Sequence, residues 1–311
     1  MKLGTTLTAV SLLALSAFSA QAAETEFVTK LDPAANELPE GLALRGTDAF
    51  LGLATKQSVL RLAEGELTEF ATYPSLPEGA GFLTGLTFAK DGSLWAGLAS
   101  FAEGVTTGIY RVGAEGGEAT LHASAEGMGF PNDFTWQNDG TALVTDSIAG
   151  VIWAVSEDGS TTKWLEHPLL KGDPEVCAPD EVGYGIGANG LDFGPDGALY
   201  VAVTDRAQVL RVAIEDGKPS HVAPVNETNC DLLEGIDGII AGPEGITAAV
   251  NRTNQMSFIS YEGVVSSLSR DNMLDFPASI AATDTGYLVT NFGLVSAMTG
   301  NANPGLIKIT K

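Results

Sequence analysis

Several residues that could bind a cation recur at comparable points of a repeated segment. The comparable positions, each at the start of an expected strand, are Glu40, Thr84, Asn132, Asn189, Asp237 and Ser279. Two of these side chains are carboxylates, two are carboxamides, and none is His or Cys. Such oxygen donors suit a hard cation with waters completing its shell, whereas zinc prefers nitrogen or sulfur. We therefore expect a divalent metal, first of all Ca²⁺, with Mg²⁺, Mn²⁺ or Zn²⁺ as alternatives. The other explanation is that Asn and Asp merely begin strands through turn-like hydrogen bonds.

The elements that must position these residues are short strands in an internal repeat. Each repeat has a polar or glycine-containing lead, a strand, a tight turn such as Asp91-Gly92 or Asp196-Gly197, and a second strand. A third apolar strand and a more variable fourth follow. Four strands recurring six times predict an all-β fold, a six-bladed β-propeller with four-stranded blades around a central channel. The segment "ETEFVTKLD" near residue 24 is expected to supply the outer strand of the last blade.

In a propeller the inner strands begin on one face, so the strand-start residues should surround one mouth of the channel. The second strands should return to the same face. This would place a further ring of polar residues there, either supporting the metal ligands or contacting substrate: Asp146, Asp205, Asn251 and Asn291.

At this point the sequence resembles the superfamily of six-bladed propellers that contains gluconolactonases and regucalcin, with paraoxonases and diisopropyl fluorophosphatases as distant relatives. The resemblance rests on Glu40 in "PEG", Asn132 in "PND", Asn189 in "ANG" and Asp237 in "IDG". It implies that these four residues bind the catalytic divalent cation. It also implies that Asp237 acts as the base or positions water. Asp133, which follows Asn132 directly, is a candidate to orient that ligand, with simple solvation or a hydrogen bond at the strand start as the alternative.

Other chemistries have less support in the sequence. The stretch "GIGANG" (residues 185–190) has the G-x-G-x-x-G spacing of a dinucleotide site, but a β-hairpin follows it instead of a helix. We instead expect its glycines to give a flexible approach that delivers Asn189 to the axis. There is no G-x-S-x-G motif or phosphate-binding loop. The histidines, His122, His167 and His221, fall outside the strand-start positions, which disfavours the organophosphate hydrolases among the distant relatives.

Composition suggests where the protein works. Residues 1–22 have a basic start, an apolar run and an Ala20-Gln21-Ala22 cleavage site, which predict a secretory signal peptide and a periplasmic or secreted protein. Residues 23–311 should then form a single domain. With 39 acidic against 16 basic residues and a net charge of −23, neither nucleic acid nor membrane insertion is expected. We expect a monomer acting on a small molecule.

The chain has two cysteines, Cys177 and Cys230. In an oxidising compartment such a pair usually forms a disulfide, with free buried thiols as the alternative. Each lies in a loop that precedes a metal-ligand candidate, so a disulfide would fix a lid over the pocket.

Two classes of function remain open at this stage. The first is a metal-dependent lactonase or esterase that opens a lactone ring by metal-assisted attack of water. The second is a non-catalytic propeller, stabilised by calcium, that binds a sugar, a peptide or a protein partner.

Overall fold

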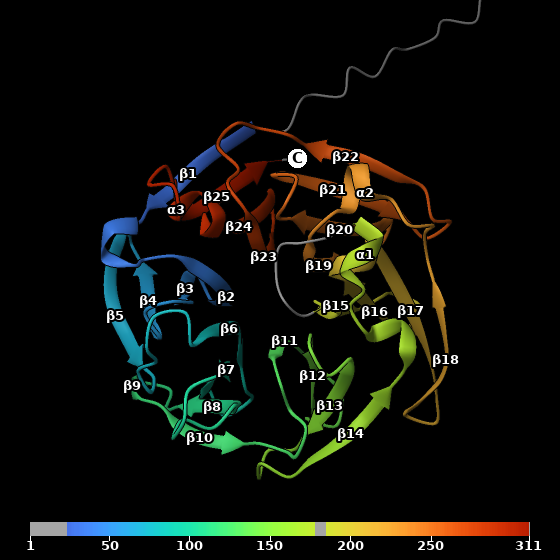
Figure 1. Cartoon of the computed structure of the whole chain (residues 1–311), viewed down its shortest axis with the longest axis horizontal. Coiled ribbons are helices and arrows are strands. Elements are labelled where there is room, and N and C mark those ends of the chain that lie inside the picture. Colours follow the sequence, from blue (N-terminus) through green and yellow to red (C-terminus); the bar gives the residue numbers. More distant parts are fainter. Residues whose placement is uncertain (1–23, 178–184, 311) are drawn as a thin grey trace, which may run out of the picture.

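The computed structural model describes residues 24–177 and 185–310, which form a ring of six β-sheets (Figure 1). The expected signal peptide lies outside the described residues. Within the described part of the chain, no helix is long and apolar enough to span a membrane. The predicted six-bladed propeller is confirmed.

The first three blades follow one another along the chain. Blade 1 contains β2 (Pro39–Arg45), β3 (Asp48–Leu53), β4 (Ser58–Ala63) and β5 (Glu66–Thr72), extended by β9 (Gly117–Glu118). Blade 2 contains β6 (Gly81–Phe88), β7 (Leu94–Ser100), β8 (Gly108–Val112) and β10 (Thr120–Ala123). Blade 3 contains β11 (Pro131–Trp136), β12 (Ala142–Asp146), β13 (Val151–Val155) and β14 (Thr161–Glu166).

The remaining blades complete the ring. Blade 4 contains β15 (Ala188–Phe193), β16 (Leu199–Val203), β17 (Gln208–Glu215) and β18 (Lys218–Pro224). Blade 5 contains β19 (Ile236–Ala241), β20 (Gly245–Val250), β21 (Gln255–Ser260) and β22 (Val265–Ser269). Blade 6 contains β23 (Pro277–Thr283), β24 (Gly286–Asn291), β25 (Gly305–Thr310) and β1 (Glu24–Lys30).

The ring is closed by the N-terminal strand, as predicted. β1 pairs antiparallel with β25, from Glu24 opposite Thr310 to Lys30 opposite Gly305. Because one blade contains both ends of the described chain, the last blade cannot separate from the first without breaking this sheet.

Apolar side chains fill the spaces between adjacent blades. Every residue of β16 and of β20 is buried, whereas the outer strands β18 and β22 are partly exposed. Six apolar clusters each join two neighbouring blades around the ring. The core therefore leaves the channel to be lined by the first strand of each blade.

Helical structure is confined to short turns among the described residues. The α-helices are α1 (Pro174–Cys177), α2 (Cys230–Leu233) and α3 (Leu294–Ala297). The 3₁₀ turns are η1 (Pro33–Ala35), η2 (Pro168–Leu170) and η3 (Thr204–Arg206). α3 follows β24 directly and contributes to the cavity described next.

Candidate metal centre at the channel mouth

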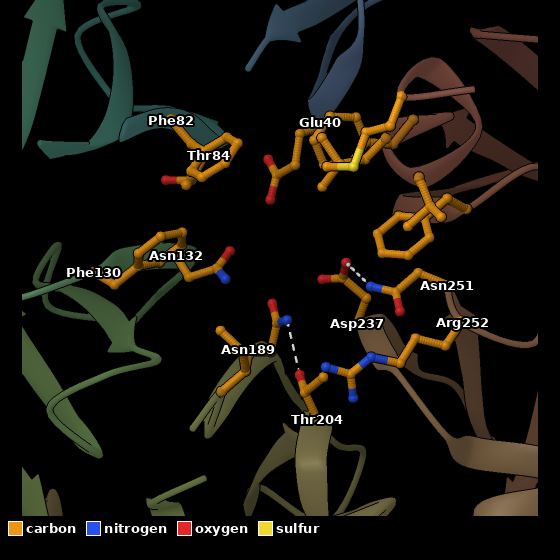
Figure 2. A pocket seen from close by; sticks show the side chains of 16 residues that line it. Glu40, Phe82, Thr84, Phe130, Asn132, Asn189, Thr204, Asp237, Asn251 and Arg252 are labelled. Carbon is orange, nitrogen blue, oxygen red and sulfur yellow. Dashed lines mark hydrogen bonds between the residues drawn. The ribbon is translucent and has the colours of Figure 1, made fainter. Parts of the chain in front are cut away.

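A cavity of about 450 Å³ lies where the first strands begin. Its polar side chains come from several blades and converge on one space (Figure 2). They are Glu40, Thr84, Asn132, Asn189, Thr204, Asp237, Asn251 and Arg252. The structure thus brings together all four residues predicted to bind a metal. Their binding of a metal itself stays a prediction.

Strand register shows which residues occupy equivalent positions. Asp237 follows Ile236, which pairs with Val250, and in blade 6 the corresponding pair is Pro277 and Asn291. Ala278, which is fully buried, therefore occupies the position of Asp237. The sequence-based assignment of Ser279 to this position was wrong by one residue.

Hydrogen bonds fix the amide of Asn132 with its oxygen toward the cavity. The Ser147 hydroxyl donates to the Ala188 carbonyl oxygen at 2.8 Å. Having used its proton, this hydroxyl accepts from Nδ2 of Asn132 at 2.9 Å. The amide nitrogen is therefore held against blade 3, and Oδ1 is left for the cavity that Asn132 lines.

The same arrangement recurs one blade further on. Thr204 Oγ1 donates to the Ile236 carbonyl oxygen at 2.8 Å and accepts from Nδ2 of Asn189 at 3.0 Å. Oδ1 of Asn189 is buried and has no hydrogen-bond partner in the structure. A buried acceptor of this kind is unfavourable unless a ligand satisfies it.

The two carboxylates complete the set from blades 5 and 1. Asn251 Nδ2 donates to Asp237 Oδ2 at 3.1 Å, which leaves the other carboxylate oxygen available. Oε2 of Glu40 is buried without a partner. In blade 1 the position that follows the second strand is Ala54, so Glu40 lacks the polar support that blades 3, 4 and 5 provide.

Charge repulsion and burial act on these carboxyl groups together. Burial, with a smaller contribution from Asp237 and Asp133, raises the pKa of Glu40 well above its ordinary value. Burial is also the main cause that raises the pKa of Asp237 to about 7, opposed by the hydrogen bond from Asn251. A divalent cation would reverse both effects because it favours the ionised carboxylates.

This donor set fits a hard divalent cation. Two carboxylates and two amide oxygens face one space, and buried oxygens of Glu40 and Asn189 have no protein partner. No group of three or more His, Cys, Asp or Glu residues suited to a metal occurs among the described residues. Oxygen-only coordination of this kind is typical of Ca²⁺ and Mg²⁺.

Sequence reasoning missed two of the residues that hold the ligands, Ser147 and Thr204, whereas the third, Asn251, belonged to the predicted ring. All three come directly after the residue that pairs with the start of the first strand, which is one residue after the predicted Asp146 and one residue before the predicted Asp205. The signal available in the sequence was a hydroxyl or amide residue immediately beyond the second strand in these three blades.

Three members of the predicted outer ring, Asp146, Asp205 and Asn291, are not among the residues that line the cavity. Asp146 is fully buried, and its carboxylate accepts hydrogen bonds from the backbone N–H groups of Gly129, Phe130 and Ala149. Asp146 therefore fixes the loop that precedes β11, and its side chain does not line the cavity.

In blade 6, Asn291 likewise fixes loop segments through hydrogen bonds to their backbone. Its Oδ1 accepts from the N–H of Asp275 at 2.7 Å, and its Nδ2 donates to the carbonyl oxygens of Met273 and Asn303. Asn291 is also fully buried. It therefore joins the segments on either side of α3 instead of reaching the cavity.

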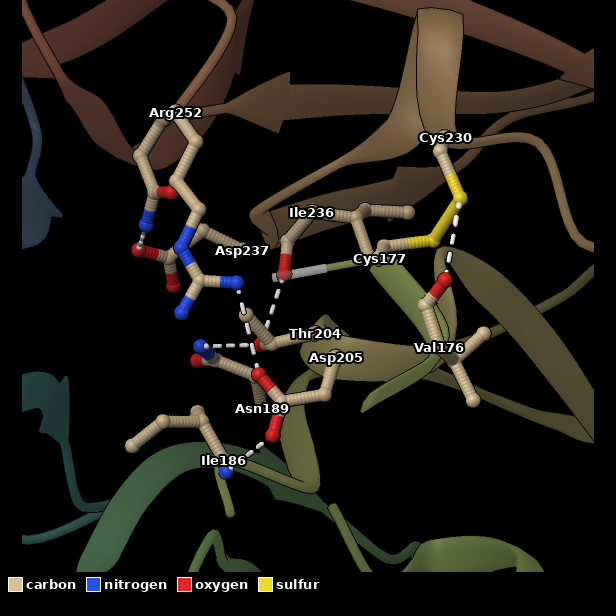
Figure 3. A network of polar contacts seen from close by, with 11 residues as sticks. Val176, Cys177, Ile186, Asn189, Thr204, Asp205, Cys230, Ile236, Asp237 and Arg252 are labelled. Carbon is tan, nitrogen blue, oxygen red and sulfur yellow. Dashed lines mark hydrogen bonds and ion pairs between the residues drawn. A yellow bond between two sulfur atoms is a disulfide. The ribbon is translucent and has the colours of Figure 1, made fainter. Parts of the chain in front are cut away.

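Asp205 lies just behind the cavity and forms an ion pair with Arg252, whose side chain lines the cavity. Its Oδ2 accepts from the N–H of Ile186 at 2.6 Å, and its Oδ1 lies 3.3 Å from Arg252 Nη1 (Figure 3). Burial raises the pKa of Asp205 despite these bonds. Asp205 therefore affects the cavity indirectly, because it holds Arg252 and the loop before β15 in place.

Asp133 does not contact the Asn132 side chain through any hydrogen bond of the structure. Its carboxylate accepts from the N–H of Phe134 at 2.8 Å and from the N–H of Leu191 at 3.3 Å, which links blades 3 and 4. Burial raises the pKa of Asp133 to about 7. Its charge in turn raises the pKa of Glu40 and of Asp237.

The glycines of "GIGANG" allow close packing, and the expected flexible approach was wrong. A Cβ on Gly190 would lie 2.4 Å from the Asp237 carbonyl oxygen, and one on Gly187 would lie 2.1 Å from the Leu170 carbonyl oxygen. Gly190 therefore lets the first strands of blades 4 and 5 approach closely enough to place Asn189 beside Asp237.

The predicted disulfide is present between Cys177 and Cys230, with their Cα atoms 5.5 Å apart. It joins α1 to α2 beside the network around Thr204 and Asp205 (Figure 3). The expected lid stays a prediction, because residues 178–184 of that loop lie outside the described residues and neither cysteine lines the cavity.

Residues 21–230 match the model of the SMP-30/Gluconolactonase/LRE-like region, and the chain belongs to this family. The matched region includes three of the predicted ligands, Glu40, Asn132 and Asn189, and ends just before Asp237. No curated protein matches the sequence.

Solved structures share the fold at low sequence identity. Regucalcin from Agrobacterium tumefaciens, described as a calcium-binding protein, is 20% identical with a TM-score of 0.64, over 91% of this chain and 93% of that one. A candidate gluconolactonase is 15% identical with a TM-score of 0.64, over 93% and 92%. Virginiamycin B lyase from Staphylococcus aureus is 14% identical with a TM-score of 0.57, over 93% and 100%. Since these proteins have different activities, the fold alone does not select a reaction.

Proposed function

We propose that the protein is a divalent-metal-dependent hydrolase that opens a lactone ring. The observation that carries the proposal is the set of inward-facing oxygens at the channel mouth, two of which, on Glu40 and Asn189, are buried without a partner. Membership of the SMP-30/Gluconolactonase/LRE-like family supports the same chemistry. Glu40, Asn132, Asn189 and Asp237 would hold the cation, with Ca²⁺ favoured by the oxygen-only donor set.

When bound, the cation would supply Lewis acidity toward the lactone carbonyl and would lower the pKa of a nearby water. Asp237 would accept the proton of the attacking water; this role is supported by its position in the cavity lining and by the hydrogen bond from Asn251 that orients its carboxylate. Water adds to the carbonyl carbon, the ring C–O bond breaks, and the proton passes to the ring oxygen. The product is the open hydroxy acid.

Lactone hydrolysis by purified protein tests this proposal. The wild type, Asp237→Asn and a matched control, Asp284→Asn in an exposed turn, are assayed with Ca²⁺ and with a chelator. We expect turnover by the wild type and by the control, lost with the chelator and with Asp237→Asn. If no lactone is turned over while Ca²⁺ still raises the melting temperature, the protein is instead a calcium-stabilised binding propeller.

We further propose that the protein is exported. The signal-like residues 1–22 and the Cys177–Cys230 disulfide both support an oxidising compartment outside the cytoplasm. Expression of the full chain in a bacterial host, followed by fractionation and N-terminal sequencing, should find it in the periplasm beginning close to Ala23. Full-length protein in the cytoplasm would contradict export.

A further inference from the structure

The cavity has two zones of different chemistry. The metal-ligand positions and their supports are polar, whereas the residues around them toward the mouth are apolar. We call this second zone the apolar collar; its main members are Phe82, Phe130, Phe276, Phe292, Leu294 and Met298.

Three phenylalanines of the collar occupy equivalent points of the repeat. Phe82, Phe130 and Phe276 each lie two residues before the strand-start position of their blade, which is Thr84, Asn132 and Ala278 respectively. Phe82 lies within β6, where residues two apart point to the same side of the sheet, whereas Phe130 and Phe276 directly precede β11 and β23. All three side chains line the cavity.

Aromatic rings group on two sides of the cavity. Phe82 and Phe130 have ring centroids 6.2 Å apart, and Phe276 and Phe292 have centroids 6.0 Å apart. Phe292 occupies in blade 6 the position that Ser147 occupies in blade 3, so an aromatic ring replaces a polar support there.

Phe276 adopts a backbone conformation that does not suit its side chain. Its φ is +53°, and it is the one aromatic residue with positive φ among the described residues. Glycine or asparagine would be accommodated more easily at this position. Such conformations occur at functional sites more often than elsewhere, and the Phe276 side chain lines the cavity.

Part of the collar is exposed to solvent. Met298 is 79% exposed and Val295 is 49% exposed, both on or just after α3. The Ser296 hydroxyl donates to Asp275 at 2.6 Å, and the N–H of Gly293 donates to the Asp275 carbonyl oxygen at 2.8 Å. These bonds hold α3 in place while its apolar side chains remain available to a ligand.

A polyhydroxylated sugar lactone does not match this collar. Its hydroxyl groups would lose water and face phenylalanine rings and aliphatic side chains that offer no hydrogen bonds. A lactone with an apolar substituent would instead bury that substituent against the collar while its ester group lies over the metal-ligand positions. The two carboxylates there, Glu40 and Asp237, further favour a neutral ligand over an anionic one.

Resting on the proposed lactonase function, we propose that the substrates are neutral lactones that carry an alkyl chain and that the apolar collar binds this chain. The cavity volume of about 450 Å³ is in the range of pockets for molecules of drug size. Selectivity then comes from apolar burial at the collar, and reactivity comes from the polar residues beneath it.

A series of γ-lactones with progressively longer n-alkyl chains tests the proposal, with glucono-δ-lactone for comparison. We expect kcat/KM to rise about fourfold for each of the first added methylene groups, with glucono-δ-lactone a poor substrate. Phe276→Asn introduces a residue that tolerates positive φ and removes the ring, so relief of backbone strain should offset part of the packing lost against Phe292 and Ala278, and the variant should still fold. We expect it to lower kcat/KM for γ-decalactone several times more than for γ-butyrolactone. Val264→Ala, at a site 66% exposed and outside the cavity lining, should change neither value.

Binding to Asp237→Asn, measured by calorimetry, separates the two proposals. If no lactone is hydrolysed but affinity still rises with chain length and falls in the double variant with Phe276→Asn, the lactonase function fails and the apolar ligand class stands. If lactones are hydrolysed with no chain-length dependence, or with glucono-δ-lactone preferred, the apolar collar proposal is overturned and the lactonase function stands.

Discussion

Replacing Thr204 by valine should weaken metal binding without any change in the ligands themselves. Thr204 is 3% exposed. Its hydroxyl donates a hydrogen bond to the Ile236 carbonyl oxygen at 2.8 Å and accepts one from Asn189 Nδ2 at 3.0 Å. Valine keeps the shape but removes both bonds. The Asn189 amide is then free to turn its nitrogen toward the cavity, where a cation would be repelled.

The magnitude follows from these two bonds. A buried hydrogen bond contributes about 1 kcal/mol net, and a buried polar group left unpaired costs about 1–3 kcal/mol. We therefore expect Thr204→Val to lower the free energy of unfolding of the metal-free protein by about 2–4 kcal/mol. Loss of a residue that orients a metal ligand typically reduces metal affinity about 10- to 100-fold, and we expect Ca²⁺ binding to weaken to this extent.

Calorimetric titration with Ca²⁺ and urea unfolding in chelator measure the two effects separately. Thr247→Val is the matched control, because Thr247 is also buried and its hydroxyl bonds to Tyr287 at 2.8 Å away from the cavity lining. It should lower stability and leave Ca²⁺ affinity unchanged. Equal Ca²⁺ affinity in Thr204→Val and the wild type, or an equal loss in both variants, would refute the orientation of Asn189 described above.

Three further predictions concern pH, the disulfide and the loop segments that Asn291 joins. Because burial raises the pKa of Glu40, Asp237 and Asp133, the metal-free folded state binds extra protons, so its stability should fall as pH rises from about 4 to about 7. Melting in chelator across this range should show the fall, and Ca²⁺ should reduce it by removing the contribution of the two ligands, Glu40 and Asp237; a flat profile in chelator would contradict the raised pKa values. The double variant Cys177→Ala/Cys230→Ala should lose about 2–4 kcal/mol of unfolding free energy in urea, and no loss would show that the bond does not constrain the unfolded chain. Asn291→Leu, which removes three buried hydrogen bonds, should be destabilised by about 3 kcal/mol or more; unfolding at the wild-type urea midpoint would contradict its assignment as a link between loops.

The sequence predicted the blades because their signals are local. Tight turns such as Asp91-Gly92 and Asp196-Gly197 mark each hairpin, and Gly92 and Gly197 indeed have positive φ. The repeat then fixes the number of blades, and the spare strand near residue 24 fixes how the ring closes. These features require no knowledge of which residues pair across the sheet.

The details of the site depend on register, which the sequence does not display. A bulge between Pro131 and Phe134 shifts the pairing in blade 3, and comparable bulges occur in the other first strands. A shift of one residue changes which side chains reach the cavity. The predicted ring took Asp146, one residue before the position of Ser147, and Asp205, one residue after the position of Thr204, whereas the predicted Asn251 lies at this position.

The phenylalanines of the apolar collar can be seen in the sequence, but the sequence does not show that they line a cavity. Phe82, Phe130 and Phe276 each begin a repeat, and an apolar residue at a strand start is ordinarily a core residue. Their place beside the ligands became apparent only when the first strands were arranged around one axis. The positive φ of Phe276 has no sequence signature, since the residue types that favour it are absent at that position.

Direct observation of the metal tests the central claim most sharply. Crystals of the mature protein grown with Ca²⁺, and a second set with Mn²⁺ for its anomalous signal, would locate any bound ion. We expect one ion at the channel mouth, about 2.3–2.6 Å from oxygens of Glu40, Asn132, Asn189 and Asp237 in the Ca²⁺ crystals. Crystals at millimolar metal with no ion among these oxygens, or with Asn132 and Asn189 presenting nitrogen to the cavity, would contradict the metal centre.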